Sequence, residues 1–166
     1  MNAISLLPLL LALVLSPLLL GIISRTKALF AGRHGQSFLQ TYYDLWKLLR
    51  KGAVYSRTTT WVFRAGPTLG LAAVLMATML MPLGNCPALI AFPADFFLFA
   101  CLLGLMRFST VVAALDTGSS FEGMGASREV FFSALAEPAL LVALAALARH
   151  AKTLSLSTMF AHNAGG

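Results

Sequence analysis

The first residues that could carry chemistry form the tripeptide Asp116-Thr117-Gly118, within the stretch VVAALDTGSSFEGMGASREVFF at 111–132. Aspartic proteases carry such a sequence at the catalytic carboxylate. Their chemistry needs two carboxylates that share a proton, each on a loop of a β-sheet, so that the two pKa values separate. This chain has one such tripeptide, and it lies between apolar segments without strand-like alternation. An intramembrane hydrolase that uses Asp116 is therefore kept only as an alternative.

Nucleotide and metal chemistry find less support. The stretch GMGASR at 123–128 lacks the third glycine, the preceding strand and the lysine of a phosphate-binding loop. Cys86 and Cys101 do not have the CxxC spacing of a zinc or iron–sulfur site, and the three histidines are scattered. We expect no metal or cofactor in this chain and no disulfide between the two cysteines.

Two charged residues stand inside apolar segments, where a charge costs about 2.5–3.5 kcal/mol on insertion scales. Arg107 lies eight residues before Leu115, and Glu137 lies seven residues after Val130. At about 1.5 Å per residue, both would sit about 10–12 Å from the same membrane face. We hypothesise that Arg107 and Glu137 form an ion pair or share one hydrated polar cluster. A buried pair that only fixes the helix register is the alternative.

The composition identifies the kind of protein that holds these residues. The 166-residue chain is 58% apolar and 11% charged, against roughly 45–50% and 25% in soluble proteins. Its mean hydropathy is +0.82. A soluble fold could not cover its surface with so few polar groups, so the sequence predicts an all-α membrane protein that forms a single membrane domain over 1–166.

Apolar runs of about 20 residues are long enough to cross a hydrocarbon core of about 30 Å as helices. The segment at 37–51 differs, because aromatic and basic residues occupy opposite faces at helical spacing. Ser37 and Gln40 suggest a capping box at its start. This segment fits a helix on the membrane surface or one packed on protein. The predicted spans are about 3–23, 61–82, 96–115 and 130–147.

The charge distribution predicts the topology. Eight of the basic residues lie between Ser24 and Arg64, with Asp44 as the one acid. Such a cluster between apolar runs is typical of a cytoplasmic loop, and nucleic acid is not an expected partner. The N-terminus would then lie outside, and the segment 116–129 would be a flexible, glycine-containing cytoplasmic loop that ends near Ser127. The tail from Arg149 would lie outside, although Arg149 and Lys152 oppose that placement.

Several longer segments resemble one known family. They are RHGQSFLQTYYDLWKLLRKGAV at 33–54, WVFR at 61–64 and LDTGSSFEGMGASREVFFSALAEPALL at 115–141. Together they resemble the membrane subunit of group 4 energy-converting hydrogenases, of the formate hydrogenlyase subunit 4 and hydrogenase-4 component C type. These subunits are homologues of subunit 1 of respiratory complex I.

The resemblance implies a non-catalytic subunit of a prokaryotic plasma membrane. It would join a hydrophilic [NiFe]-hydrogenase arm to an antiporter-like membrane subunit. The nickel–iron and iron–sulfur centres would belong to the large and small partner subunits, which would dock on the loops 24–60 and 116–129. Glu137 aligns with the intramembrane glutamate of the family, and Arg128 with a shared loop arginine. The coupling candidates are Glu137, Arg107 and Glu129; the docking candidates are Arg33, Asp44, Lys47, Asp116 and Arg128.

The chain also departs from the family pattern. Relatives have R-R-G-P where this chain has Arg33-His34-Gly35-Gln36, and an acidic residue near Gly52-Ala53 is missing. Family members are about twice as long, so the resemblance covers their N-terminal half. The alternatives are a quinone-site subunit of a complex I-like NADH dehydrogenase and a small transporter that acts alone. Sequence does not distinguish proton from sodium movement.

Overall fold

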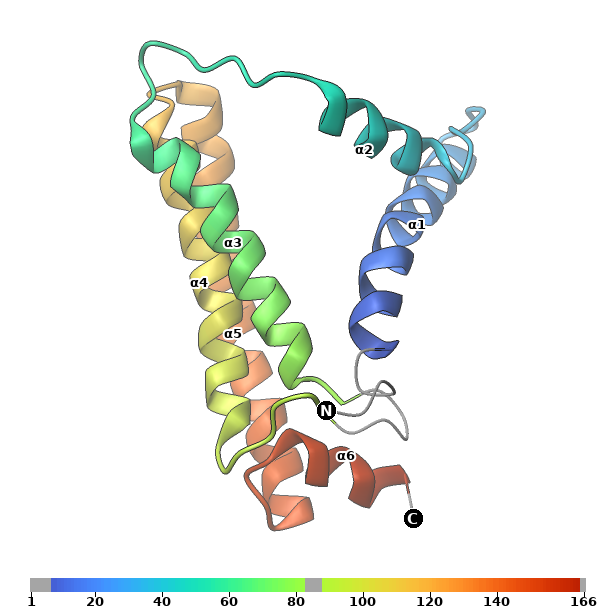
Figure 1. The fold of residues 1–166 in the computed structure, drawn as a ribbon, viewed down its shortest axis with the longest axis vertical. Coiled ribbons are helices and arrows are strands. Elements are labelled where there is room, and N and C mark those ends of the chain that lie inside the picture. The colour runs from blue at the N-terminus through green and yellow to red at the C-terminus, as the bar shows by residue number, and fades with distance from the viewer. Residues whose placement is uncertain (1–6, 83–87, 165–166) are drawn as a thin grey trace. The chain divides into compact units, whose positions relative to one another are not determined.

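The structure is a computed structural model that describes residues 7–82 and 88–164, with side chains described for 9–82 and 88–160. Within those residues it contains six α-helices and no strand (Figure 1). Four helices are long and apolar enough to cross a membrane. The predicted all-α membrane class is therefore confirmed. Cys86 lies outside the described residues. The expectation of no disulfide between Cys86 and Cys101 therefore falls outside them as well.

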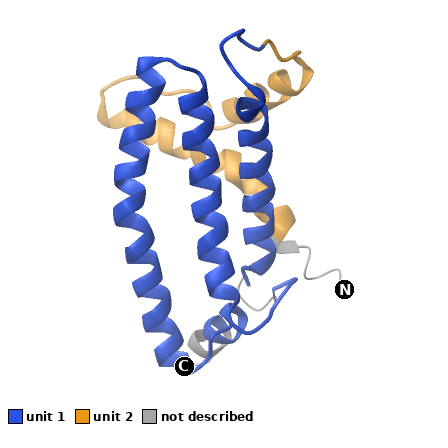
Figure 2. Ribbon diagram, turned by 90° about the vertical axis from the view of Figure 1, so that its left-hand side faces the viewer, with its two compact units in different colours: residues 1–6, 55–166 blue, residues 7–54 orange. Residues whose placement is uncertain are grey.

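The chain divides into two compact units (Figure 2). One is Leu7–Val54, which holds helices α1 and α2. The other contains the described residues from Tyr55 onward, with helices α3 to α6. The single membrane domain expected over 1–166 stays a prediction.

In the smaller unit, α1 (Leu7–Phe30) packs against α2 (Gln40–Arg50) and the segment before it. The Tyr42 hydroxyl donates a hydrogen bond to the Val14 carbonyl. The Arg25 guanidinium lies over the Phe38 ring, 4.3 Å from its centroid. A Cβ atom at Gly21 would lie 2.5 Å from the Phe38 carbonyl oxygen, so glycine is required for this close approach. Helix α1 runs seven residues past the predicted end at 23.

The predicted capping box of α2 is wrong. The N-cap residue is Leu39, and no side chain caps this end. Because the helix begins at Gln40, that residue occupies the first helical position instead of the third. The Gln40 amide donates instead to the Asp44 carboxylate at 3.1 Å. The α2 surface remains largely apolar on one side, where Leu45, Trp46 and Leu49 are exposed.

The larger unit is built on three long helices: α3 (Trp61–Leu80), α4 (Asp95–Asp116) and α5 (Ser120–Ala151). Helix α4 packs against both α3 and α5 (Figures 1 and 2). Small residues line much of the α3–α4 contact, as in many membrane helix pairs. A Cβ atom at Gly66 would lie 2.6 Å from the Ala113 Cβ, and one at Gly70 would lie 3.2 Å from the Ser109 hydroxyl.

Helix α5 differs from the predicted span at 130–147 and from the predicted loop at 116–129. It begins at Ser120 and runs for 32 residues. Of the three glycines in this segment, Gly118 has a left-handed backbone with φ of 67°, whereas Gly123 and Gly125 are helical. A glycine costs about 1 kcal/mol in a helix, which is too little for two of them to break this one. The flexible loop is thus a short turn.

A sixth helix, α6 (Leu156–Ala164), was not predicted. Its Leu156 and Met159 are buried against Phe96 of α4 and Leu144 and Ala148 of α5. The signal was present but short: a serine followed by apolar residues at positions 156, 159 and 160. Nine residues are too few for periodicity to identify a helix without its tertiary contacts.

Candidate functional site

The α4–α5 contact contains a pocket of about 400 Å³ that brings the two intramembrane charges together. Both Arg107 and Glu137 line it and are half-buried. The predicted proximity of Arg107 and Glu137 is therefore present in the fold. Apart from these two and Ser133, the lining residues are Gly104, Phe108, Val111, Val130 and Ala134.

The two charges are offset by about one helical turn. The Glu137 carboxylate oxygens lie 3.9 Å from the position that a Cβ atom would take at Gly104. Gly104 is three residues from Arg107, or about 4.5 Å along the helix. Both residues belong to the described chain, and neither makes an ion pair or a hydrogen bond there. The geometry fits the shared polar cluster, whereas direct pairing stays a prediction.

Sequence reasoning missed Ser133, the third polar group of this pocket. Its hydroxyl oxygen is buried and has no hydrogen-bond partner in the structure. Ser133 stands one turn before Glu137 on α5 and lines the same pocket. A buried polar atom without a partner is uncommon in folded proteins. We call Arg107, Ser133 and Glu137 the polar cluster. It unites a titratable carboxyl, a fixed cation and a hydroxyl between apolar walls, which is an arrangement that can hold a proton.

Asp116 has a structural task at the end of α4. Its carboxylate accepts hydrogen bonds from the Thr60 amide at 2.7 Å, the Thr60 hydroxyl at 2.7 Å and the Phe63 amide at 3.2 Å. These amides are the free donors at the start of α3, where the helix dipole favours an anion. Both oxygens are thus engaged in joining α4 to α3. Within residues 9–82 and 88–160 no second carboxylate takes part, so the described chain does not show the protease geometry around Asp116.

At the other end of α4, Asp95 also accepts hydrogen bonds from the start of another helix. Sequence reasoning missed this residue. Its side chain is fully buried. One carboxylate oxygen accepts from the Leu156 amide at 2.7 Å and the other from the Ser155 hydroxyl at 3.0 Å. Asp95 and Asp116 stand at the two ends of α4. Asp95 therefore caps the start of α6, and Asp116 caps the start of α3.

The remaining predicted site residues are dispersed. Arg33, Asp44 and Lys47 are exposed in the smaller unit, and Arg128 and Glu129 are exposed on α5. Glu129 lies eight residues, or about 12 Å along the helix, from Glu137, and it does not line the pocket. Among the described residues, no group of histidine, cysteine and carboxylate side chains could hold a metal ion.

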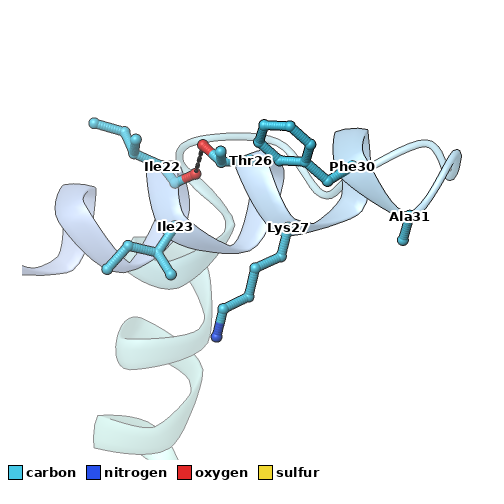
Figure 3. Close-up of a pocket in the computed structure, with 6 residues that line it drawn as sticks. All are labelled: Ile22, Ile23, Thr26, Lys27, Phe30 and Ala31. Atoms are coloured by element: carbon cyan, nitrogen blue, oxygen red, sulfur yellow. Dashed lines mark hydrogen bonds between the residues drawn. The ribbon is translucent and has the colours of Figure 1, made fainter.

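A further pocket, of about 570 Å³, runs along the C-terminal part of α1 (Figure 3). All its lining residues come from α1 and the residue that follows it, and they include Ile22, Phe30 and Lys27. Thr26 uses its hydroxyl to donate to the Ile22 carbonyl at 2.8 Å. A groove on one helix, with one cation, has no converging polar groups and supports no chemistry by itself.

The fold and the polar cluster define an integral membrane protein with ionisable groups between its helices. The family model described as NADH dehydrogenase matches residues 2–165. The chain belongs to this family, that of complex I subunit 1.

Two curated relatives place the chain more closely, and both come from Escherichia coli strain K12. It is similar to hydrogenase-4 component C, with 35% identity over 136 residues that cover 82% of this chain and 43% of the relative. It is also similar to formate hydrogenlyase subunit 4, with 34% identity over 155 residues that cover 92% of this chain and 50% of the relative. The resemblance seen in the sequence is confirmed. The chain spans about half the length of these relatives.

Proposed function

We propose that this chain is an integral membrane subunit of a hydrogenase or formate hydrogenlyase-like complex in a prokaryotic plasma membrane. It would anchor a hydrophilic [NiFe]-hydrogenase arm beside an antiporter-like subunit. The observation that carries this proposal is the similarity to two subunits named for such complexes, over 82% and 92% of the chain. The partner subunits would hold the nickel–iron and iron–sulfur centres.

The polar cluster supports a part in proton or ion coupling. Intramembrane ionisable residues are costly, and they commonly mark ion paths in membrane proteins. Glu137 borders a pocket with Arg107 and an unpartnered hydroxyl. In this proposal Glu137 holds the transferred proton. Arg107 supplies a positive charge in the same pocket, and Ser133 offers a hydrogen bond to whichever form of the carboxyl is present.

Affinity purification from native membranes tests the proposed partnership. Co-purification of a [NiFe] subunit with hydrogen-evolving activity would support it. Co-purification of NADH-oxidising subunits would favour the quinone-site alternative, and a chain that carries ions without partners would favour the lone transporter.

A substitution of Glu137 tests the coupling. We expect Glu137→Gln to leave the complex assembled and hydrogen evolution largely intact, while hydrogenase-linked ion movement across vesicle membranes is lost. The exposed carboxylate Glu122 provides the matched control as Glu122→Gln. Normal ion movement in Glu137→Gln would refute the role of Glu137.

The exchange Arg107→Glu with Glu137→Arg tests pairing separately. If the two side chains interact, the double variant should assemble better than either single variant. If the double variant shows no such recovery, the two charges act independently. The offset of about one turn predicts partial recovery at most.

A further inference from the structure

A separate pocket of about 550 Å³ lies at the far end of α5 from the polar cluster. Most of its wall is apolar and comes from the start of α4, the last turns of α5 and the segment before α6. Phe96, Phe97, Ala145, Ala148 and Leu154 form that wall. Phe97 and Leu154 are more than half exposed, so the pocket opens to its surroundings.

Two cations stand at this apolar pocket. Arg149 and Lys152 both line it, are exposed, and lie three residues apart at the end of α5. In the described part of the chain neither forms an ion pair or donates a side-chain hydrogen bond. The buried carboxylate of Asp95, at the start of α4, is occupied by Ser155 and Leu156. The positive charge of the pocket is thus not neutralised by these residues.

The pocket wall has a fixed backbone. Lys152 adopts a left-handed conformation with φ of 53°, and its amide donates to the Ala148 carbonyl. Ala94, which precedes α4, is also left-handed with φ of 70°, and its amide donates to the Leu154 carbonyl at 3.1 Å. The first contact closes the end of α5, and the second joins the segment after α5 to the residue before α4.

The position of the two cations is unusual. Asp116 binds the start of α3, so the turn between α4 and α5 lies at the same end of the unit as Arg57 and Arg64. Helix α5 then carries Arg149 and Lys152 to the opposite end. In the topology that the charge distribution predicts, this end faces the outside of the membrane, where the positive-inside tendency disfavours lysine and arginine. A specific anionic ligand would account for both residues.

We propose that this pocket binds an anionic phospholipid of the membrane leaflet at that end of α5. Arg149 and Lys152 would donate hydrogen bonds to the phosphate, and an acyl chain would lie on Phe97 and Ala145. Basic residues beside membrane helices hold anionic head groups in this way, and arginine binds phosphate in a two-pronged geometry. The inference rests on the membrane location of the helices and is independent of the proposed hydrogenase partnership.

Native mass spectrometry of the intact protein in detergent, titrated with phosphatidylglycerol, tests the proposal. We expect Arg149→Gln with Lys152→Gln to weaken binding of the tightest lipid by about tenfold or more, because two charges near an anionic phosphate are lost. The matched control is Lys51→Gln with Arg57→Gln, which removes two exposed cations elsewhere and should retain that lipid. Helical circular dichroism of both variants verifies that they are folded.

Three results would overturn the proposal. Equal weakening in both double variants would show diffuse charge attraction instead of a site. Equal binding of phosphatidylcholine would show that the negative head group is not recognised. Equal competition by glycerol 3-phosphate would show a site for soluble phosphate, because that molecule lacks the acyl chains.

Discussion

Three carboxylates of this protein show how the environment of a residue decides its use. Asp95 and Asp116 each place both oxygens on donors at the start of another helix. Glu137 has no such partner in the part of the chain that the structure describes, and it lines a pocket together with the cation Arg107. A carboxylate with all its acceptors engaged is suited to structure, whereas an unengaged one beside a pocket is free to gain and lose a proton. Glu137 is therefore the residue that we propose for any proton chemistry, in line with the hypothesis drawn from the sequence.

At the residue scale, we predict that Asp116→Ala destabilises the larger unit. The change removes three hydrogen bonds and leaves the Thr60 and Phe63 amides without their acceptor. Asp116→Asn keeps one acceptor oxygen and should cost less. Thermal unfolding in detergent, followed by circular dichroism, measures both.

The control for Asp116 is Glu129→Ala, which removes an exposed carboxylate that makes no hydrogen bond in the described chain. Its unfolding temperature should stay near that of the unmodified protein. If Asp116→Ala unfolds at the same temperature as this control, the joint between α4 and α3 is not important for stability.

At the scale of the elements, small residues decide how closely α3 and α4 pack. We predict that Gly66→Ala destabilises the protein by about 1–3 kcal/mol, the usual cost of overpacking. The added methyl group would lie 2.6 Å from the Ala113 Cβ and 3.0 Å from the Ser109 carbonyl oxygen. Unfolding in detergent against a denaturant measures the loss.

Gly123→Ala is the matched control for Gly66. Gly123 is also helical, but an added Cβ atom there meets nothing within 4 Å. Because alanine is the better helix former, we expect this variant to be unchanged or more stable by up to about 1 kcal/mol. Equal destabilisation of both variants would mean that helix packing at Gly66 is looser than the structure indicates.

Helix α6 depends on the buried carboxylate at the start of α4. We predict that Asp95→Ala weakens the packing of α6 against α4 and α5. The change leaves the Leu156 amide and the Ser155 hydroxyl without their acceptor, which should destabilise the folded state by about 1–3 kcal/mol. Limited proteolysis should then cut between α5 and α6 faster. The exposed Asp44→Ala serves as the control, and cleavage at equal rates in the two variants would refute the role of Asp95.

At the scale of the whole molecule, the fold predicts which segments share a membrane face. In a chain with Cys86→Ser and Cys101→Ala, we expect Arg57→Cys and Ser120→Cys to react with a membrane-impermeant maleimide from the cytoplasmic side. Leu154→Cys should react only from the other side. Labelling of Ser120→Cys and Leu154→Cys from the same side would contradict a span formed by α5.

Much of this architecture was predictable because a bilayer restricts it so strongly. Chains that cross hydrocarbon must satisfy their backbone hydrogen bonds within helices, so long apolar runs gave the positions of α3 and α4 to within two residues. Helix ends outside such runs are not marked by apolar length. The early start of α5 and the existence of α6 depend on a single turn at Gly118 and on burial of Leu156 and Met159, which periodicity does not reveal.

The sequence by itself determined the membrane class, the family and the candidate charges, because composition, apolar length and motif order do not depend on tertiary contacts. Only the tertiary structure decided how these charges are arranged. The register between α4 and α5 sets Glu137 opposite Gly104 and adds Ser133 to the cluster. The packing of α3 against α4 brings Asp116 to the start of α3. Register follows from side-chain packing between segments, so a single segment read alone does not contain it.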